Sequence, residues 1–189
     1  MEDYKKYKWF FTSNKRLVVA GKSDSSNDEL LLNLKKLNRE FWVAHASQPG
    51  SPFAVICARP EIVKDEDLEE LAVFTGCFSK AWKLGKKTTE IHLFKLSQVE
   101  KKRGMKTGSW IVNGKIKKVK IELMLVLTKQ RGTLKAVPEK STRKIFLRIV
   151  PGLTDKTKMV EKIAIALGDI KVDKEEILSA LPAGGLKIK

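Results

Sequence analysis

Two histidines and two cysteines are the residues with which this chain could do nucleophilic or metal chemistry. His45 lies in the stretch FWVAHASQPGSPF, residues 41–53, between two strand-like runs, and His92 lies far away in the sequence. Cys57 and Cys77 stand singly in apolar surroundings, which is typical of buried, reduced thiols and does not indicate a disulfide. No H-E-x-x-H or C-x-x-C spacing and no glycine-rich phosphate loop occurs, so no metal or cofactor is expected. A dyad of His45 with one of the cysteines stays open as an alternative to a binding role.

Charge is the strongest compositional signal. The chain of 189 residues has 38 Lys and Arg against 22 Asp and Glu, a net charge of +16. Such a surplus favours a polyanionic partner, with nucleic acid ahead of anionic lipid, although a solvated lysine-rich surface would have the same composition. The acidic segment EIVKDEDLEE, residues 61–70, is interpreted as the start of a helix, because acids favour that end of the helix dipole.

Aromatic residues alternate with lysines at several places along the chain. Trp9, Trp42, Trp82 and Trp110 all lie close to lysines in the sequence. Exposed aromatic rings stack on unpaired bases while lysines follow the phosphates. A tryptophan in a strand or helix is more often part of the core, so we expect most of these rings to be buried.

The periodicity of apolar residues predicts an α+β fold: a mostly antiparallel mixed sheet packed by two main helices, with a small C-terminal α/β extension. Strands are expected at 9–13, 16–21, 41–45, 53–57 and 88–96, and in a hairpin around Asn113-Gly114 that spans 109–127. Helices are expected at 27–40, with Ser26 or Asn27 as N-cap, and at 66–83.

The residue pattern changes in the C-terminal third of the chain. A basic loop leads to a strand at 144–150 that Pro151-Gly152 should end, and Thr154 should cap a helix that stops at Gly168. A short helix over VDKEEILSAL and a tail follow. We therefore expect a core at 1–117 and a basic extension at 118–189.

The N-terminus and the later apolar runs bear on membrane association. MEDYKKYKWFF has no apolar core of signal-peptide length, and the run LMLVL is far too short to span a bilayer. A cytoplasmic protein without membrane contact is expected.

Five blocks in order, WFFTS, GKSDSSNDELL, FWVAHASQPGSPFAVI, SKAW and QVEKKRGMKTGSWIV, resemble the NFACT-R domain, also catalogued as a domain of unknown function. That domain forms the C-terminal part of fibronectin-binding-protein-like ribosome quality-control factors. The resemblance covers about Lys8 to Gly114 and implies a non-enzymatic, stand-alone RNA-binding member. Its partner would be tRNA or ribosomal RNA, and possible contact with the ribosome follows from the same resemblance.

The family motifs fall on residues that suit RNA contact in kind: polar groups near a helix N-terminus, glycines that allow close backbone approach, and cations. The candidate RNA-binding residues are Asp24, Asn27, His45, Gly50, Ser51, Ser79, Lys80, Trp82, Lys101, Lys102, Arg103, Gly104 and Lys106. In the extension, basic residues from Lys129 to Arg148 either lengthen the RNA footprint or cap the sheet edge.

Two other functions remain open at this point. The chain could be an enzyme or accessory subunit of an RNA-modification system, with Cys57 or Cys77 and His45 as its chemistry. It could also bind DNA, a reading that depends on charge alone.

Overall fold

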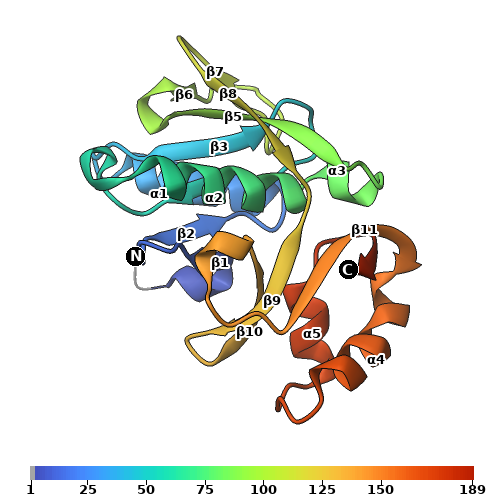
Figure 1. Cartoon of the computed structure of the whole chain (residues 1–189). Coiled ribbons are helices and arrows are strands. Elements are labelled where there is room, and N and C mark those ends of the chain that lie inside the picture. The colour runs from blue at the N-terminus through green and yellow to red at the C-terminus, as the bar shows by residue number, and fades with distance from the viewer. Residues whose placement is uncertain (1–2) are drawn as a thin grey trace.

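Six antiparallel strands form the central sheet of the computed structural model, which describes residues 3–189. Their order is β1-β2-β4-β3-β5-β8 (Figure 1). The strands are β1 (Lys8–Phe11), β2 (Leu17–Ala20), β4 (Ala54–Ile56), β3 (Trp42–Ala46), β5 (Thr88–Lys95) and β8 (Lys117–Glu122). A short 3-10 turn, η1 (Tyr4–Lys6), precedes β1, and η2 (Pro60–Ile62) follows β4. The predicted α+β class is confirmed.

Two helices cover the two faces of this sheet. Neighbouring strand residues such as Val18 and Val19 belong to different apolar clusters, because successive side chains of a strand point to opposite faces. Helix α1 (Asp24–Lys35) packs on one face and α2 (Asp65–Cys77) on the other. Strands buried on both sides explain why β2 and β4 are apolar almost throughout.

The starts of the helices differ in part from expectation. Helix α1 begins after Ser23, whose hydroxyl accepts a hydrogen bond from the Ser26 N–H at 3.2 Å, so the predicted N-cap at Ser26 or Asn27 is wrong. The Asn27 side chain points inward instead and accepts a hydrogen bond from the Phe53 N–H. The acidic run does start α2, as predicted, but that helix ends at Cys77, and α3 (Lys80–Lys83) follows as a separate turn.

The hairpin predicted at Asn113-Gly114 is wrong. Strand β7 (Ile111–Val112) pairs with β6 (Val99–Glu100), which follows η3 (Leu96–Gln98), and β8 pairs with β5. The side-chain amide of Gln98 donates to the carbonyl oxygens of Asn113 and Lys115, both at 2.8 Å, and holds the turn against β6.

A second, four-stranded sheet lies in the C-terminal part, in the order β10-β9-β11-β12. Its strands are β9 (Leu125–Gln130), β10 (Thr133–Val137), β11 (Leu147–Asp155) and β12 (Gly185–Ile188). We call residues 125–189 the C-terminal module; it also contains η4 (Glu139–Ser141), α4 (Lys156–Leu167) and α5 (Lys174–Ala180). Residues 118–122 of the expected extension instead belong to β8 in the central sheet.

The ends of the elements in the module also correct two predictions. Pro151-Gly152 does not end β11, because the strand continues through an irregularity in register to Asp155. Asp155, rather than Thr154, caps α4 by accepting a hydrogen bond from the Thr157 N–H at 2.8 Å. Helix α4 stops at Gly168 as expected, where φ is +58°.

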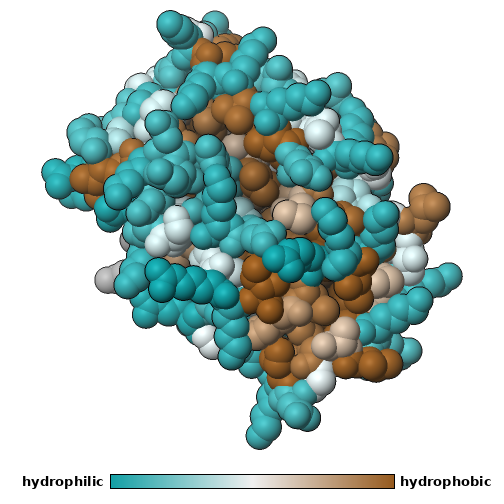
Figure 2. Space-filling model, in the orientation of Figure 1, coloured by the Kyte–Doolittle hydropathy of each residue, from teal (hydrophilic) through white to brown (hydrophobic). Residues whose placement is uncertain are grey.

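The two sheets share one apolar core. Side chains of α2, such as Phe74, and side chains of the C-terminal module, such as Leu127 and Ile163, belong to a single buried cluster. In the view of Figure 2, hydrophilic residues cover much of the visible surface around the central sheet, and apolar residues gather over the C-terminal module. Among the described helices, none combines the length and apolar character needed to cross a bilayer.

Candidate nucleic-acid interface

A groove of about 430 Å³ lies where three segments far apart in the sequence meet. The N-terminal turn of α1 supplies Asp24, the end of β3 and the loop after it supply His45 and Gln48, and the loop before β7 supplies Lys106 and Trp110. The fold therefore brings together three of the sequence blocks that were predicted to bind RNA.

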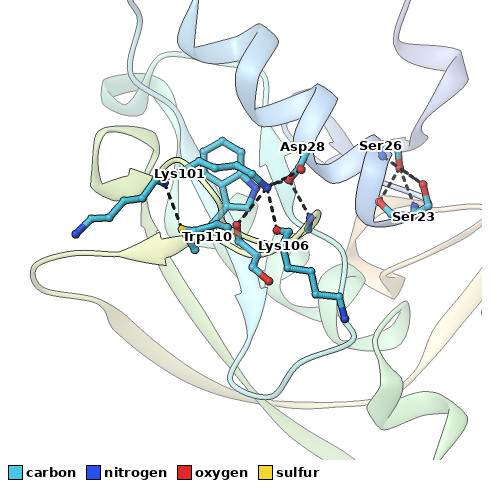
Figure 3. A network of polar contacts seen from close by, with 10 residues as sticks. Ser23, Ser26, Asp28, Lys101, Lys106 and Trp110 are labelled. Carbon is cyan, nitrogen blue, oxygen red and sulfur yellow. Dashed lines mark hydrogen bonds and ion pairs between the residues drawn. The ribbon is translucent and has the colours of Figure 1, made fainter.

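Asp28 on α1 holds the loop 101–110 against the helix (Figure 3). Its carboxylate accepts hydrogen bonds from Lys101 Nζ at 2.6 Å, from Trp110 Nε1 at 2.7 Å and from the Gly108 N–H at 3.1 Å. Burial opposes ionisation of this carboxyl, but the hydrogen bonds from Lys101, Trp110 and Gly108 outweigh it and hold the pKa of Asp28 below its usual value.

Lys101 is a structural residue of this loop. Its ammonium group pairs with Asp28 and also donates to the carbonyl oxygens of Lys106 and Ser109, and its side chain is only 19% exposed. We expected Lys101 to offer its charge to RNA, but its ammonium group already forms an ion pair with Asp28 inside the protein.

The other cations of the loop are free to meet a ligand. Lys102, Arg103 and Lys106 are exposed, and the Lys106 side chain extends away from the Asp28 network in Figure 3. Gly104 lies between them with φ +84°, a conformation that favours glycine and turns the loop.

The loop between β3 and β4 forms the opposite wall. Ser51 is buried, and its hydroxyl accepts from the Ala46 N–H and donates to the Pro52 carbonyl. Gly50 has φ +90°, and its carbonyl accepts a hydrogen bond from the Lys80 N–H at 2.7 Å. The exposed side chain of Lys80 thus stands directly beside this loop.

Four of the candidate residues are buried. Asn27, Ser51, Ser79 and Trp82 are between 0% and 8% exposed; Asn27 and Ser51 still line the groove, whereas Ser79 and Trp82 lie behind it. Ser79 caps α3, and Trp82 lies in the core because its position in that helix faces α2 and the sheet. Trp9 is buried too, whereas Trp42 and Trp110 are only partly buried, so two of the four tryptophans fit the expectation that most are inside.

His45 is partly buried in the groove wall. Its ring lies against Phe53, with ring centroids 4.4 Å apart, and its Nδ1 is 2.7 Å from the Ala46 carbonyl oxygen. Burial lowers the pKa of His45. Because a carbonyl oxygen only accepts, Nδ1 carries the proton of the neutral ring, and Nε2 becomes an acceptor suited to a hydroxyl or amino group.

The two thiols lack the features of an activated nucleophile. Burial raises the pKa of Cys57 to about 11 and that of Cys77 further, and the Cys77 thiol donates a hydrogen bond to the Met124 carbonyl oxygen at 3.7 Å. Residues 3–189 contain no group of three His, Cys, Asp or Glu side chains placed to hold a metal ion.

Sequence patterns did not single out Asp28 as a site residue, nor Lys8 and Lys22, which line an adjoining cavity of about 270 Å³. Asp28 reads in the sequence as one of several acids at a helix start, and its partners are distant in the chain. Only the fold shows that distant sequence blocks are held together by one partly buried carboxylate.

Comparisons with known proteins show what the chain is similar to. Residues 6–114 match the family model described as the NFACT protein RNA binding domain. The chain is 32% identical over 197 residues to the archaeal Rqc2 homolog aRqcH of Methanocaldococcus jannaschii, with 98% of this chain covered. That match includes the C-terminal module, and the chain spans 29% of the length of the relative.

A solved structure is similar in fold. The C-terminal part of the fibronectin/fibrinogen-binding protein from Streptococcus suis superposes with a TM-score of 0.52 at 19% identity. The similarity covers 62% of this chain and 45% of that one.

Proposed function

The chain belongs to the NFACT RNA-binding domain family, and from this premise we propose that it binds tRNA or ribosomal RNA without catalysing a reaction. Its place would be the cytoplasm, in translation or ribosome-associated quality control, in line with its similarity to an archaeal Rqc2 homolog. The groove between α1, the β3–β4 loop and the loop 101–110 would be where RNA is held.

The observation that carries the proposal is the convergence of three distant sequence blocks on one groove with exposed cations at its border. Lys80, Lys102, Arg103 and Lys106 are placed to follow phosphates. The partly exposed Trp110 ring and the His45 acceptor offer stacking and a hydrogen bond to a base or a 2′-hydroxyl.

A competition experiment tests RNA against DNA. We would measure binding of labelled tRNA at several salt concentrations, with unlabelled tRNA or duplex DNA of equal phosphate concentration as competitor. The proposal predicts that tRNA competes better at every salt concentration. Equal competition by duplex DNA would mean that the protein binds nucleic acid through charge alone and does not prefer RNA.

A charge-removal variant tests the groove. Replacing Lys102, Arg103 and Lys106 with Gln should weaken tRNA binding and flatten the log–log salt slope by about 2 to 3 units, at roughly 0.7 to 0.9 for each lost phosphate contact. The matched control removes the charges of Lys158, Lys162 and Lys171, which are exposed in the C-terminal module. If the control weakens binding as much as the groove variant, the groove is not the binding site.

A further inference from the structure

The C-terminal module is joined to the open edge of β1 by specific contacts. The Gln130 side chain accepts a hydrogen bond from the Phe11 N–H at 2.7 Å and donates to the Phe11 carbonyl oxygen at 2.9 Å. The guanidinium of Arg131 lies 5.2 Å from the centre of the Phe11 ring. The edge strand of the central sheet is therefore covered, and a seam forms between the two sheets.

Lys8 and Lys22 line one cavity beside this seam, Lys135 lies over the Trp9 ring of β1, and the charge of Lys156 acts on Lys8. Lys8 comes from β1, Lys22 from the turn before α1, Lys135 from β10 and Lys156 from the first turn of α4. We call these four residues the seam lysines. Within residues 3–189 none of them forms an ion pair within 4 Å, whereas Lys101 and Lys140 do.

Two of the seam lysines are held in place by aromatic rings. Lys8 Nζ lies 4.5 Å from the centre of the Phe78 ring, and Lys135 Nζ lies 3.9 Å from the centre of the Trp9 ring. Both side chains are partly buried. Ring contacts fix the position of an ammonium group but do not neutralise its charge.

The ammonium groups act on one another. Burial first, and then the charges of Lys156, Lys22 and Lys135, lower the pKa of Lys8 to about 8. Burial and the charge of Lys22 likewise lower the pKa of Lys135 to about 8, with Lys5 adding to the effect and Glu176 opposing it. Asp24 is the acid that lines the same cavity as Lys8. The positive charge at the seam is thus only partly compensated by the protein.

A cavity gives a ligand access to this charge. It has a volume of about 270 Å³ and is lined by Lys8, Lys22, Ser23 and Phe78, with Ala183 of the C-terminal module. Its wall includes Asp24, Asn27, Gly50 and Ser51, which also line the groove described above, so the two hollows adjoin one another.

We propose that the seam lysines bind a phosphate group of the RNA backbone, in a second site that continues the groove onto the C-terminal module. This inference rests on the proposed RNA-binding function and extends it to a part of the chain outside the matched family region. A phosphate in the cavity would meet the ammonium groups of Lys8 and Lys22 directly, and the charges of Lys135 and Lys156, which act on Lys8, would favour its binding.

Direct titration of the lysines tests the site. NMR of protein labelled at lysine Cε and Nζ would follow Lys8 and Lys135 alone, with inorganic phosphate, and with a short single-stranded oligoribonucleotide. The oligonucleotide should raise both pKa values by about one unit, because a bound anion favours the ammonium form. Binding should correspondingly weaken by about fivefold for each of these lysines between pH 7 and pH 9, which ordinary surface lysines would not cause.

A double variant separates function from structure. Lys8→Met with Lys135→Met keeps the methylene packing on Phe78 and Trp9, and should weaken oligonucleotide binding about tenfold or more while thermal stability is kept or raised. The matched control is Lys162→Met with Lys171→Met, both exposed. A variant that loses stability yet binds like the parent would show that these lysines only anchor the sheet edge.

The outcomes distinguish the seam from the proposed function. If the parent protein does not bind the oligonucleotide at all, the proposed function fails. If it binds, but the two pKa values do not move and the double variant binds normally, the seam inference alone fails. If inorganic phosphate raises the pKa values while RNA affinity is insensitive to the variant, the seam is a small-anion site and the assignment to RNA is overturned.

Discussion

Replacement of Asp28 by Asn separates the effect of groove geometry on RNA affinity from the effect of net charge. The change raises the net charge from +16 by one unit, so attraction between overall charges predicts tighter binding to RNA. The structure predicts the opposite, because Asp28 is the acceptor that holds the loop 101–110 on α1.

The size of the effect follows from the contacts of Asp28. Asn keeps one oxygen that can accept from Trp110 or Gly108, so the main loss is the charged hydrogen bond with Lys101. The two side chains are 16% and 19% exposed, which limits screening by solvent. A hydrogen bond between charged groups contributes about 1.5–3 kcal/mol, so a loss of about 2 kcal/mol would shift the equilibrium toward an open loop by up to about 30-fold.

Two measurements check this prediction. Fluorescence anisotropy at fixed salt should show tRNA binding weakened by about five- to thirtyfold, and hydrogen exchange in 101–110 should become faster while the central sheet stays protected. Asp169→Asn is the matched control, because Asp169 is exposed and its loss changes the net charge equally. Tighter or unchanged binding by Asp28→Asn, with exchange in the loop unaltered, would refute the role given to this loop.

Further substitutions and titrations probe single residues. Lys106→Ala should flatten the salt slope of tRNA binding by about 0.7 to 0.9, measured by anisotropy, and an unchanged slope would place this lysine outside the site. Cys57, with a pKa of about 11, should react with a disulfide reagent at pH 8 about a hundred times more slowly than a free cysteine, and Cys77 only on unfolding; fast reaction of either would revive the enzyme hypothesis. Because burial lowers the pKa of His45 below 6.5, the unfolded chain binds more protons there, so the free energy of unfolding should fall as pH drops below about 6.5; urea unfolding of the His45→Gln variant should lack that component. Gly21→Ala should cost about 2 kcal/mol in urea unfolding, because its Cβ would lie 2.1 Å from a buried amide oxygen on α1; a variant as stable as the parent would mean that the helix start can move.

The parts of the fold that the sequence predicts well are those set by local patterns. The strand pair β1–β2 needs only two apolar runs and a tight turn, and the structure pairs them in register from Lys8–Ala20 to Phe11–Leu17. The acids before α2 mark its start because they favour the N-terminal end of a helix wherever the rest of the chain lies.

Two of the wrong predictions involve competition from distant residues. Asn113-Gly114 is a strong hairpin signal, but its flanking residues pair with β6 and β5, which the turn itself does not specify. Asn is a favourable N-cap residue, yet the side chain of Asn27 accepts a hydrogen bond from the N–H of Phe53, which is distant in the sequence. A local preference of about 1 kcal/mol is overridden where a buried polar group would otherwise lose its partner.

The fold brings sequence blocks of the candidate site together in the groove, but the surroundings of each single residue depend on distant contacts in the same way. A count of positive charges treats Lys101 and Lys8 alike, and the dense run KKRGMK draws attention to the first. In the fold, Lys101 is paired with Asp28 and shapes a loop, whereas Lys8 lies in an ordinary strand and faces other cations. The attraction of an anion depends on the positive charge that the protein's own acidic side chains do not neutralise. The amount of this charge depends on which side chains the two sheets bring together. Charge density along the sequence therefore favours a nucleic-acid partner in general, while the positions that we propose for single phosphates depend on the groove cations and on the seam where the C-terminal module joins β1.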